Sequence, residues 1–209
     1  MRWTGDGNGR KTAMYVLTAD QRGSRTGRDL VPDILADGSP SGLLRPFERT
    51  AGDEVQAVFD SPAGLALVAI DLASSGDWSV GIGIGDIETP LPPSTRAGRG
   101  AAFIDARTAV EDAKRNRWHL CIVGESSWCA SAQTAARLLL DVLADRTDAG
   151  HEAVSLVAQG LTQSAAATRL GISPQAMSLR LQHARWDIEP SARELFTDLL
   201  TAANIGVDA

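Results

Sequence analysis

Short apolar runs through the first 124 residues predict strands interleaved with helices. Runs rich in Val, Ile, Leu and Phe indicate strands, and proline at the start of an alanine-rich run indicates a helix. The predicted strands cover 14–20, 43–50, 55–61 and 78–88, and the predicted helices cover 28–37 (interrupted by Pro32), 62–74 and 101–116. This β-α-β-β-α-β order predicts an α+β fold with a ferredoxin-like or palm sheet, antiparallel and with helices on one face. Residues 118–124 are expected to add an edge strand.

A helical period with small residues marks 161–185 and predicts a helix-turn-helix. Thr162 is placed to cap the first helix, and Gly171 falls where a tight turn requires a positive φ. Ser173 and Pro174 then supply an N-cap and a first helical residue. The positions expected to face inward are Ala166, Ala167, Leu170, Met177, Leu181 and Ala184. An ordinary helical hairpin would show the same features and remains the alternative.

The same pattern leaves polar side chains of the second helix outside the core. Such side chains can reach base edges or phosphates in a major groove, so we expect double-stranded DNA as a partner. The candidate DNA-binding residues are Ser173, Gln175, Ser178, Arg180, Gln182 and Arg185. No Asp or Glu occurs from Ala153 to Trp186, but residues 150–209 as a whole carry more acids than bases. This weak positive charge favours a homodimer that reads two half-sites.

Composition restricts the class of protein. The chain has 209 residues and a net charge of −6, which leaves room for two small domains and excludes a generally basic nucleic-acid coat protein. Cys121 and Cys129 fit a reducing cytoplasm, and their spacing is no metal motif. No apolar run reaches membrane-spanning length, and no signal-peptide pattern opens the chain. We therefore expect a cytoplasmic protein without a membrane partner.

The patterns divide the chain into four parts. Residues 1–13 are polar and glycine-rich and predict a flexible tail, and 14–124 form the palm-like sensor domain. Residues 125–149 are expected to be a linker, with a helix over 127–145, and residues 150–209 to be the all-α helix-turn-helix domain. The leucine-rich stripe of the linker helix could hold a dimer together or face the core of one chain.

Carboxylates at the end of the first strand and at the hairpin tip predict a ligand site. In a palm sheet these positions are neighbours, and converging carboxylates coordinate Mg²⁺ with the phosphates of a nucleotide. Glycine and arginines after the first strand suit the same phosphates. The candidate ligand-binding residues are Asp20, Arg22, Gly23, Ser24, Arg25, Asp53 and Glu54, joined by the loop after residue 85; the candidate metal ligands are Asp20 and Asp53. A solvated turn and a capping aspartate are the alternative interpretation.

These motifs carry two resemblances. YVLTADQRGSR, RTAGDEVQAVF and GIGIG, followed by GRGAAFIDARTAVEDAK, resemble the SatD family of small bacterial proteins over about residues 14–116. They are more distantly similar to GGDEF diguanylate cyclases and class III nucleotide cyclases. That similarity implies that Asp20 and Asp53 hold two metal ions over a nucleoside triphosphate, with Glu54 as the neighbouring acid. The segment 161–185 resembles the helix-turn-helix of sigma-factor region four and LuxR-type regulators.

Departures from the cyclase pattern argue against catalysis. The hairpin tip is Ala-Gly-Asp-Glu-Val, and the positions of the Asn and Arg of class III cyclases hold Ile104 and Thr108, with Arg107 one position away. Without these groups the site is better suited to bind a nucleotide than to convert it. We therefore predict a DNA-binding transcriptional regulator with a nucleotide-sensing front domain and assign no catalytic residue. The alternatives are a divergent metal-dependent cyclase or phosphotransferase with a helical assembly tail, and a front domain that only dimerises.

Overall fold

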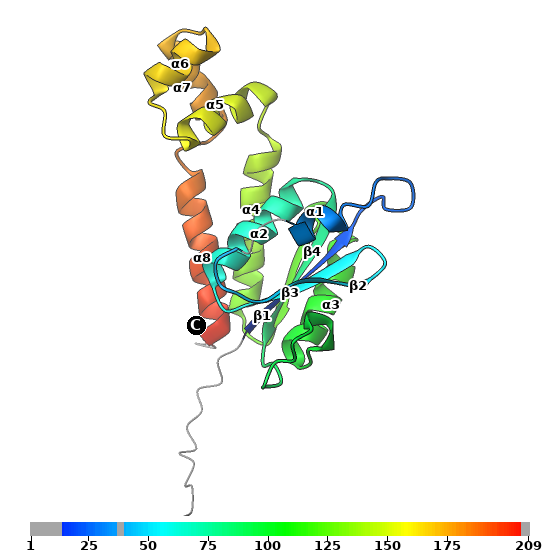
Figure 1. The fold of residues 1–209 in the computed structure, drawn as a ribbon. Helices are drawn as coiled ribbons and strands as arrows, with labels where there is room; N and C mark the ends of the chain where they lie inside the picture. The colour runs from blue at the N-terminus through cyan, green and yellow to red at the C-terminus, as the bar shows by residue number, and fades with distance from the viewer. Residues whose placement is uncertain (1–13, 37–39, 206–209) are drawn as a thin grey trace, which may run out of the picture.

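Five strands form one open, mixed sheet in the computed structural model, which describes residues 14–36 and 40–205 (Figure 1). The strands are β1 (Met14–Gln21), β2 (Leu43–Ala51), β3 (Glu54–Phe59), β4 (Trp78–Gly85) and β5 (Leu120–Gly124), in the order β2-β3-β1-β4-β5. β1 is antiparallel to β3 and β4, and β2 is antiparallel to β3. The first four strands thus have the predicted ferredoxin-like order. The predicted edge strand is confirmed as β5, which pairs with β4 in parallel.

Helices cover both faces of this sheet: the two helices of the β-α-β-β-α-β order share one face, as predicted, and the helix that follows them covers the other. α2 (Pro62–Ser74) packs on one face, and α3 (Ala101–Ala113) packs on the other, mainly against β4. The reason lies in the glycines of β4, since a Cβ at Gly83 would overlap the carbonyl oxygen of Ala102. A Cβ at Gly81 would likewise overlap the backbone nitrogen of Val110. One face of β4 therefore presents isoleucines and the other admits a helix backbone.

The first helix also differs from prediction, since it begins at Val31 and not at residue 28. α1 (Val31–Ala36) contains Pro32 in its first turn, where the missing amide hydrogen is tolerated, so this proline does not interrupt the helix. The predicted end of that helix at residue 37 and the predicted tail 1–13 lie outside the described residues. η1 (Thr95–Ala97) is a short 3₁₀ turn in the loop between β4 and α3. Within the described ranges, no helix combines the length and apolar character that crossing a membrane requires.

The last helix returns to the sheet, although the sequence assigned it to the helix-turn-helix domain. α8 (Glu189–Ile205) buries Phe196 and Leu200 completely, in the same core as α2, the sheet and α4 (Trp128–Ala144). The hydroxyl of Tyr15 on β1 donates to the carbonyl oxygen of Leu200 at 3.1 Å. Leu139 of α4 is buried in this core too, whereas Leu138 is 63% exposed. The predicted linker helix is thus a core helix of the sheet domain.

Three short helices form a separate head between α4 and α8. They are α5 (Asp148–Ala158), α6 (Gln163–Leu170) and α7 (Pro174–His183), and Figure 1 shows them at one end of the α4–α8 pair. Their buried residues make a second apolar cluster, apart from the core of the sheet. The head therefore spans 148–183, and α8 connects it back to the body.

Candidate functional site

The turn between α6 and α7 has the geometry that the sequence predicts. Gly171 adopts the left-handed conformation at φ 65°, and α7 begins at Pro174. The hydroxyl of Thr162 accepts from the Ala165 amide at 3.2 Å, and that of Ser173 accepts from the Ala176 amide at 3.1 Å. Both predicted caps and the predicted turn are therefore confirmed.

A small core fixes the orientation of α7. Met177 is fully buried and Leu181 is 4% exposed, and both contact the buried alanines of α6 and the apolar residues of α5. Ile172 and Trp186 pack against the edge of this cluster. The face of α7 opposite Met177 and Leu181 is consequently directed away from the head.

Predicted DNA-binding residues occupy that outward face. Gln175, Ser178 and Gln182 are exposed and follow the spacing i, i+3, i+7, so they form one stripe along α7. Ser173 and Arg185 are exposed near its two ends. This arrangement places amide, hydroxyl and guanidinium groups where a groove of DNA could receive the helix.

Two residues of α7 differ from expectation. Arg180 is half-buried, and its Nη1 lies 3.5 Å from Oε2 of Glu152, which competes for its charge. Leu179 was not selected from the sequence, because an apolar residue at helical spacing indicates a core position. It is 54% exposed beside the polar stripe, where it could contact a thymine methyl group.

A buried ion pair joins the head to both long helices. Arg146 follows α4 and Glu189 begins α8, and Nη2 and Oε2 lie 2.5 Å apart with side chains 4% and 10% exposed. Nε of Arg146 also donates to the carbonyl oxygen of Ala184 just after α7, and Arg193 donates to Glu189 at 2.8 Å. Burial acts to raise the pKa of Glu189, but the two arginines outweigh it and hold the pKa below its ordinary value. Sequence reasoning missed this contact because its partners are 43 positions apart.

Among the predicted acids, Asp20 and Glu54 are paired in register on β1 and β3. The carboxylate of Asp20 lies 2.8 Å from Nζ of Lys114, which also contacts Glu111 at 2.8 Å. Burial acts to lower the pKa of Lys114, but its two carboxylate partners outweigh that effect and raise it. Glu54 accepts a hydrogen bond from the hydroxyl of Thr50. Each strand carboxylate thus has a protein partner.

Asp53 lies in a separate, open depression of about 470 Å³. Its lining residues are Gln21, Ser24, Arg25, Asp29, Arg49, Gly52 and Asp53. The hydroxyl of Ser24 donates to the Asp53 carboxylate, while Arg22 donates to the carbonyl oxygen of Gly76 instead. Gly23 supplies the turn at φ 69°. The structure therefore brings Ser24, Arg25 and Asp53 together, but Asp20, Arg22 and Glu54 do not line the same depression.

The predicted contribution of the loop after residue 85 is wrong. The antiparallel register pairs Gly85 with Met14, at the end of β1 opposite Asp20. Among the residues that the structure describes, no three or more His, Cys, Asp or Glu side chains gather so as to hold a metal ion. The Mg²⁺ site at Asp20 and Asp53 gains no support from this geometry and stays a prediction.

The loop between β4 and α3 instead lines a groove on the α3 face of the sheet. The groove measures about 820 Å³, and its walls come from the loop and from the first two turns of α3. It carries three arginines, Arg96, Arg99 and Arg107, and Gln56 of β3 also lines it. Sequence reasoning weighed Arg107 only as a departure from the cyclase pattern. The sequence feature that could have indicated this groove is the presence of three arginines within twelve positions of an acidic chain.

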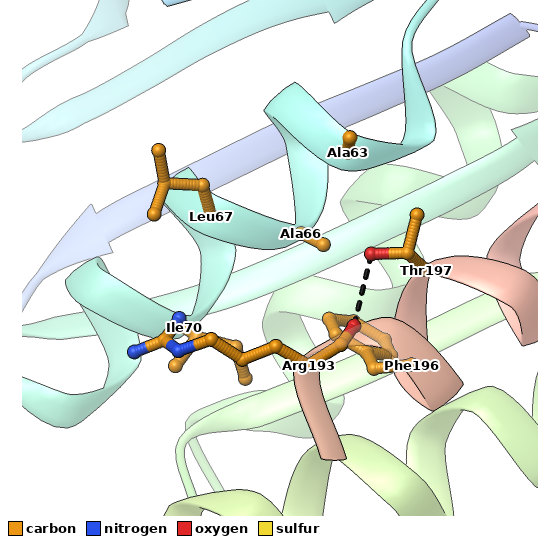
Figure 2. A pocket seen from close by; sticks show the side chains of 7 residues that line it. All are labelled: Ala63, Ala66, Leu67, Ile70, Arg193, Phe196 and Thr197. Carbon is orange, nitrogen blue, oxygen red and sulfur yellow. Dashed lines mark hydrogen bonds between the residues drawn. The ribbon is translucent and has the colours of Figure 1, made fainter. Parts of the chain in front are cut away.

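An apolar hollow of about 270 Å³ lies between α2 and α8 (Figure 2). Leu67, Ile70 and Phe196 line it, and Arg193 lies at its edge. The hydroxyl of Thr197 is turned back to the carbonyl oxygen of Arg193 at 2.9 Å. Its lining therefore offers packing and one cation that already binds Glu189, with no acid–base pair.

Comparison of the chain with models of protein families, with curated proteins and with solved structures finds no match. The resemblances to the SatD family and to the two regulator families therefore stay predictions.

Proposed function

We propose that this protein is a DNA-binding transcriptional regulator that reads DNA with α7. The observation that carries the proposal is the exposed stripe of Gln175, Ser178 and Gln182, on a helix that a glycine turn, two caps and a small core hold in place. Glutamine and serine are suited to hydrogen-bond base edges in the major groove. Arg185 at the end of the helix is suited to a phosphate.

We further propose a homodimer that reads two half-sites. One head carries few cations, so contacts to phosphate from a single copy would give modest affinity. Between α4 and α8, a groove of about 380 Å³ exposes Leu138 and Leu195, which supports a second copy as its partner. A twofold dimer predicts a palindromic operator.

We also propose that the sheet domain senses a nucleotide-type ligand and does not convert it. Lys114 already neutralises Asp20, and Ile104 and Thr108 cannot supply the groups that position a transition state in the cyclases. These contacts favour binding over the metal-dependent alternative.

The test of DNA binding begins with selection of genomic fragments by the full chain, with and without nucleotides and Mg²⁺. We expect enrichment of a short palindrome, and a change in its recovery when the sensed nucleotide is present. Failure to enrich any sequence under either condition would overturn the proposal.

Fluorescence anisotropy on the selected site then tests the residues of α7. Gln182→Ala should weaken binding by about 1–3 kcal/mol, since it removes a base contact. Gln159→Ala is the matched control, because Gln159 is an exposed glutamine at the end of α5. Equal affinity of both variants and the wild type would show that α7 does not read this DNA.

A further inference from the structure

We propose that the groove lined by Arg96, Arg99 and Arg107 binds a phosphate-bearing anion of nucleotide size. This site differs from the predicted one at Asp20 and Asp53. The proposal rests on the proposed sensing of a nucleotide-type ligand by the sheet domain, and it does not depend on DNA binding.

Charge is the first argument. The groove collects three guanidinium groups and one carboxylate, Glu88, in a chain whose net charge is −6. Arg99 and Arg107 form no side-chain hydrogen bond or ion pair with any residue in the described ranges. The guanidinium of Arg96 makes one exposed contact of 3.5 Å with Glu48, which also accepts from the Arg96 amide. These cations are therefore available to a ligand.

Convergence of two chain segments is the second argument. Arg96 and Arg99 come from the loop, whereas Arg107 comes from the second turn of α3, and all three line the same hollow. Guanidinium groups match the oxygens of a phosphate with two parallel hydrogen bonds, so several of them around one groove favour a di- or triphosphate. The volume of about 820 Å³ lies within the range of sites for small molecules and cofactors.

The floor of the groove suits the remainder of a nucleotide. A Cβ at Gly98 would overlap the ring of Phe103, so this glycine lets the loop close over the ring and shape the wall. Ile104, 68% exposed, adds apolar surface for a planar base. Gln56 is 3% exposed and donates through Nε2 to the hydroxyl of Thr18 at 2.9 Å. An amide oxygen such as that of Gln56 accepts hydrogen bonds and suits the amino group of a base.

Isothermal titration calorimetry of the full chain, without DNA, tests the proposal with ATP, GTP, pyrophosphate and adenosine. We expect ATP or GTP to bind, adenosine to bind at least about tenfold more weakly, and affinity to fall with salt. Arg107→Ala and Arg99→Ala should each weaken binding about tenfold or more, since each removes a charge-assisted hydrogen bond. Arg115→Ala is the control, because this exposed arginine of the α3 end pairs with Asp112 outside the groove.

Three results would overturn the proposal. The first is no heat of binding for any phosphate compound at millimolar concentration in a chain that unfolds cooperatively. The second is equal weakening by Arg107→Ala and Arg115→Ala, which would indicate diffuse charge. The third is weakening by Arg25→Ala but not by Arg107→Ala, which would place the ligand in the depression beside Asp53. Pyrophosphate binding as tight as that of ATP would overturn the nucleotide part alone.

Discussion

Glu189 carries its charge in a place that water scarcely reaches, between Arg146 and Arg193. Two long helices and the end of α7 meet there, because Arg146 also binds the carbonyl oxygen of Ala184. Removing one partner of a buried ion pair leaves the other charge buried without compensation. This typically lowers the free energy of unfolding by about 3–5 kcal/mol. The pair therefore sets how firmly the head is attached to the body.

Glu189→Gln should destabilise the protein at pH 7 by about 2 kcal/mol, less than full loss of a partner, because the amide keeps hydrogen bonds to the arginines. The folded pKa of Glu189 lies below its ordinary value of 4.5, so its stabilising effect is full above pH 4.5 and is lost as the pH falls through the lowered value. Urea unfolding from pH 7 to pH 3 should show the gap between wild type and variant closing in acid. A gap that stays constant or widens would contradict this account. Glu111→Gln, at an exposed pair, should leave the profile unchanged.

At the scale of elements, the contact between α3 and β4 depends on missing side chains. Gly83→Ala should destabilise the protein by about 1–3 kcal/mol or more, since its Cβ would overlap the Ala102 carbonyl and push α3 from the sheet. Gly85→Ala is the matched control on the same strand and face, where the nearest atom would be 3.5 Å away. Thermal unfolding of both variants measures the difference. Equal unfolding midpoints of the two variants would mean that α3 can shift away from Gly83 without loss of stability.

Local chemistry explains which elements the sequence could predict. Helix α2 has the predicted bounds, 62–74, because Ser61 caps it and Pro62 starts it. The turn at Gly171 was equally predictable, since caps and a left-handed glycine act within a few residues. Such signals need no knowledge of distant parts of the chain.

Contacts between distant segments explain what could not be predicted. The apolar stripe of α8 is compatible with a partner in the head or in the body, and nothing in its own residues distinguishes them. The strand at 78–88 was predicted, but the role of its glycines appears only once α3 lies above them. The arginine groove was hidden for the same reason, since Arg99 and Arg107 belong to different elements.

At the scale of the whole molecule, α4 and α8 connect the sheet domain to the head. Both helices belong to the core of the sheet domain, and at the head α4 ends and α8 begins. Figure 1 shows the pair running from the sheet domain to α5, α6 and α7. A ligand that shifts the packing of α8 against α4 would therefore also shift the head, and a dimer would convert that shift into a new spacing of two DNA-reading helices.

This arrangement predicts which elements are destabilised when the packing of α8 is disrupted. Phe196→Ala should lower the free energy of unfolding by about 3–5 kcal/mol, because the ring is fully buried against the sheet domain. In hydrogen exchange, amides of β1 and α2 should lose protection, while those of α6 and α7 keep theirs, since the head has its own apolar cluster. Ile205→Ala, at the end of the same helix, 66% exposed and outside the proposed dimer groove, should change little. Loss of protection confined to α6 and α7 would instead assign α8 to the helix-turn-helix domain, as the sequence alone predicts, and would contradict the proposed coupling of ligand binding to DNA binding through α8.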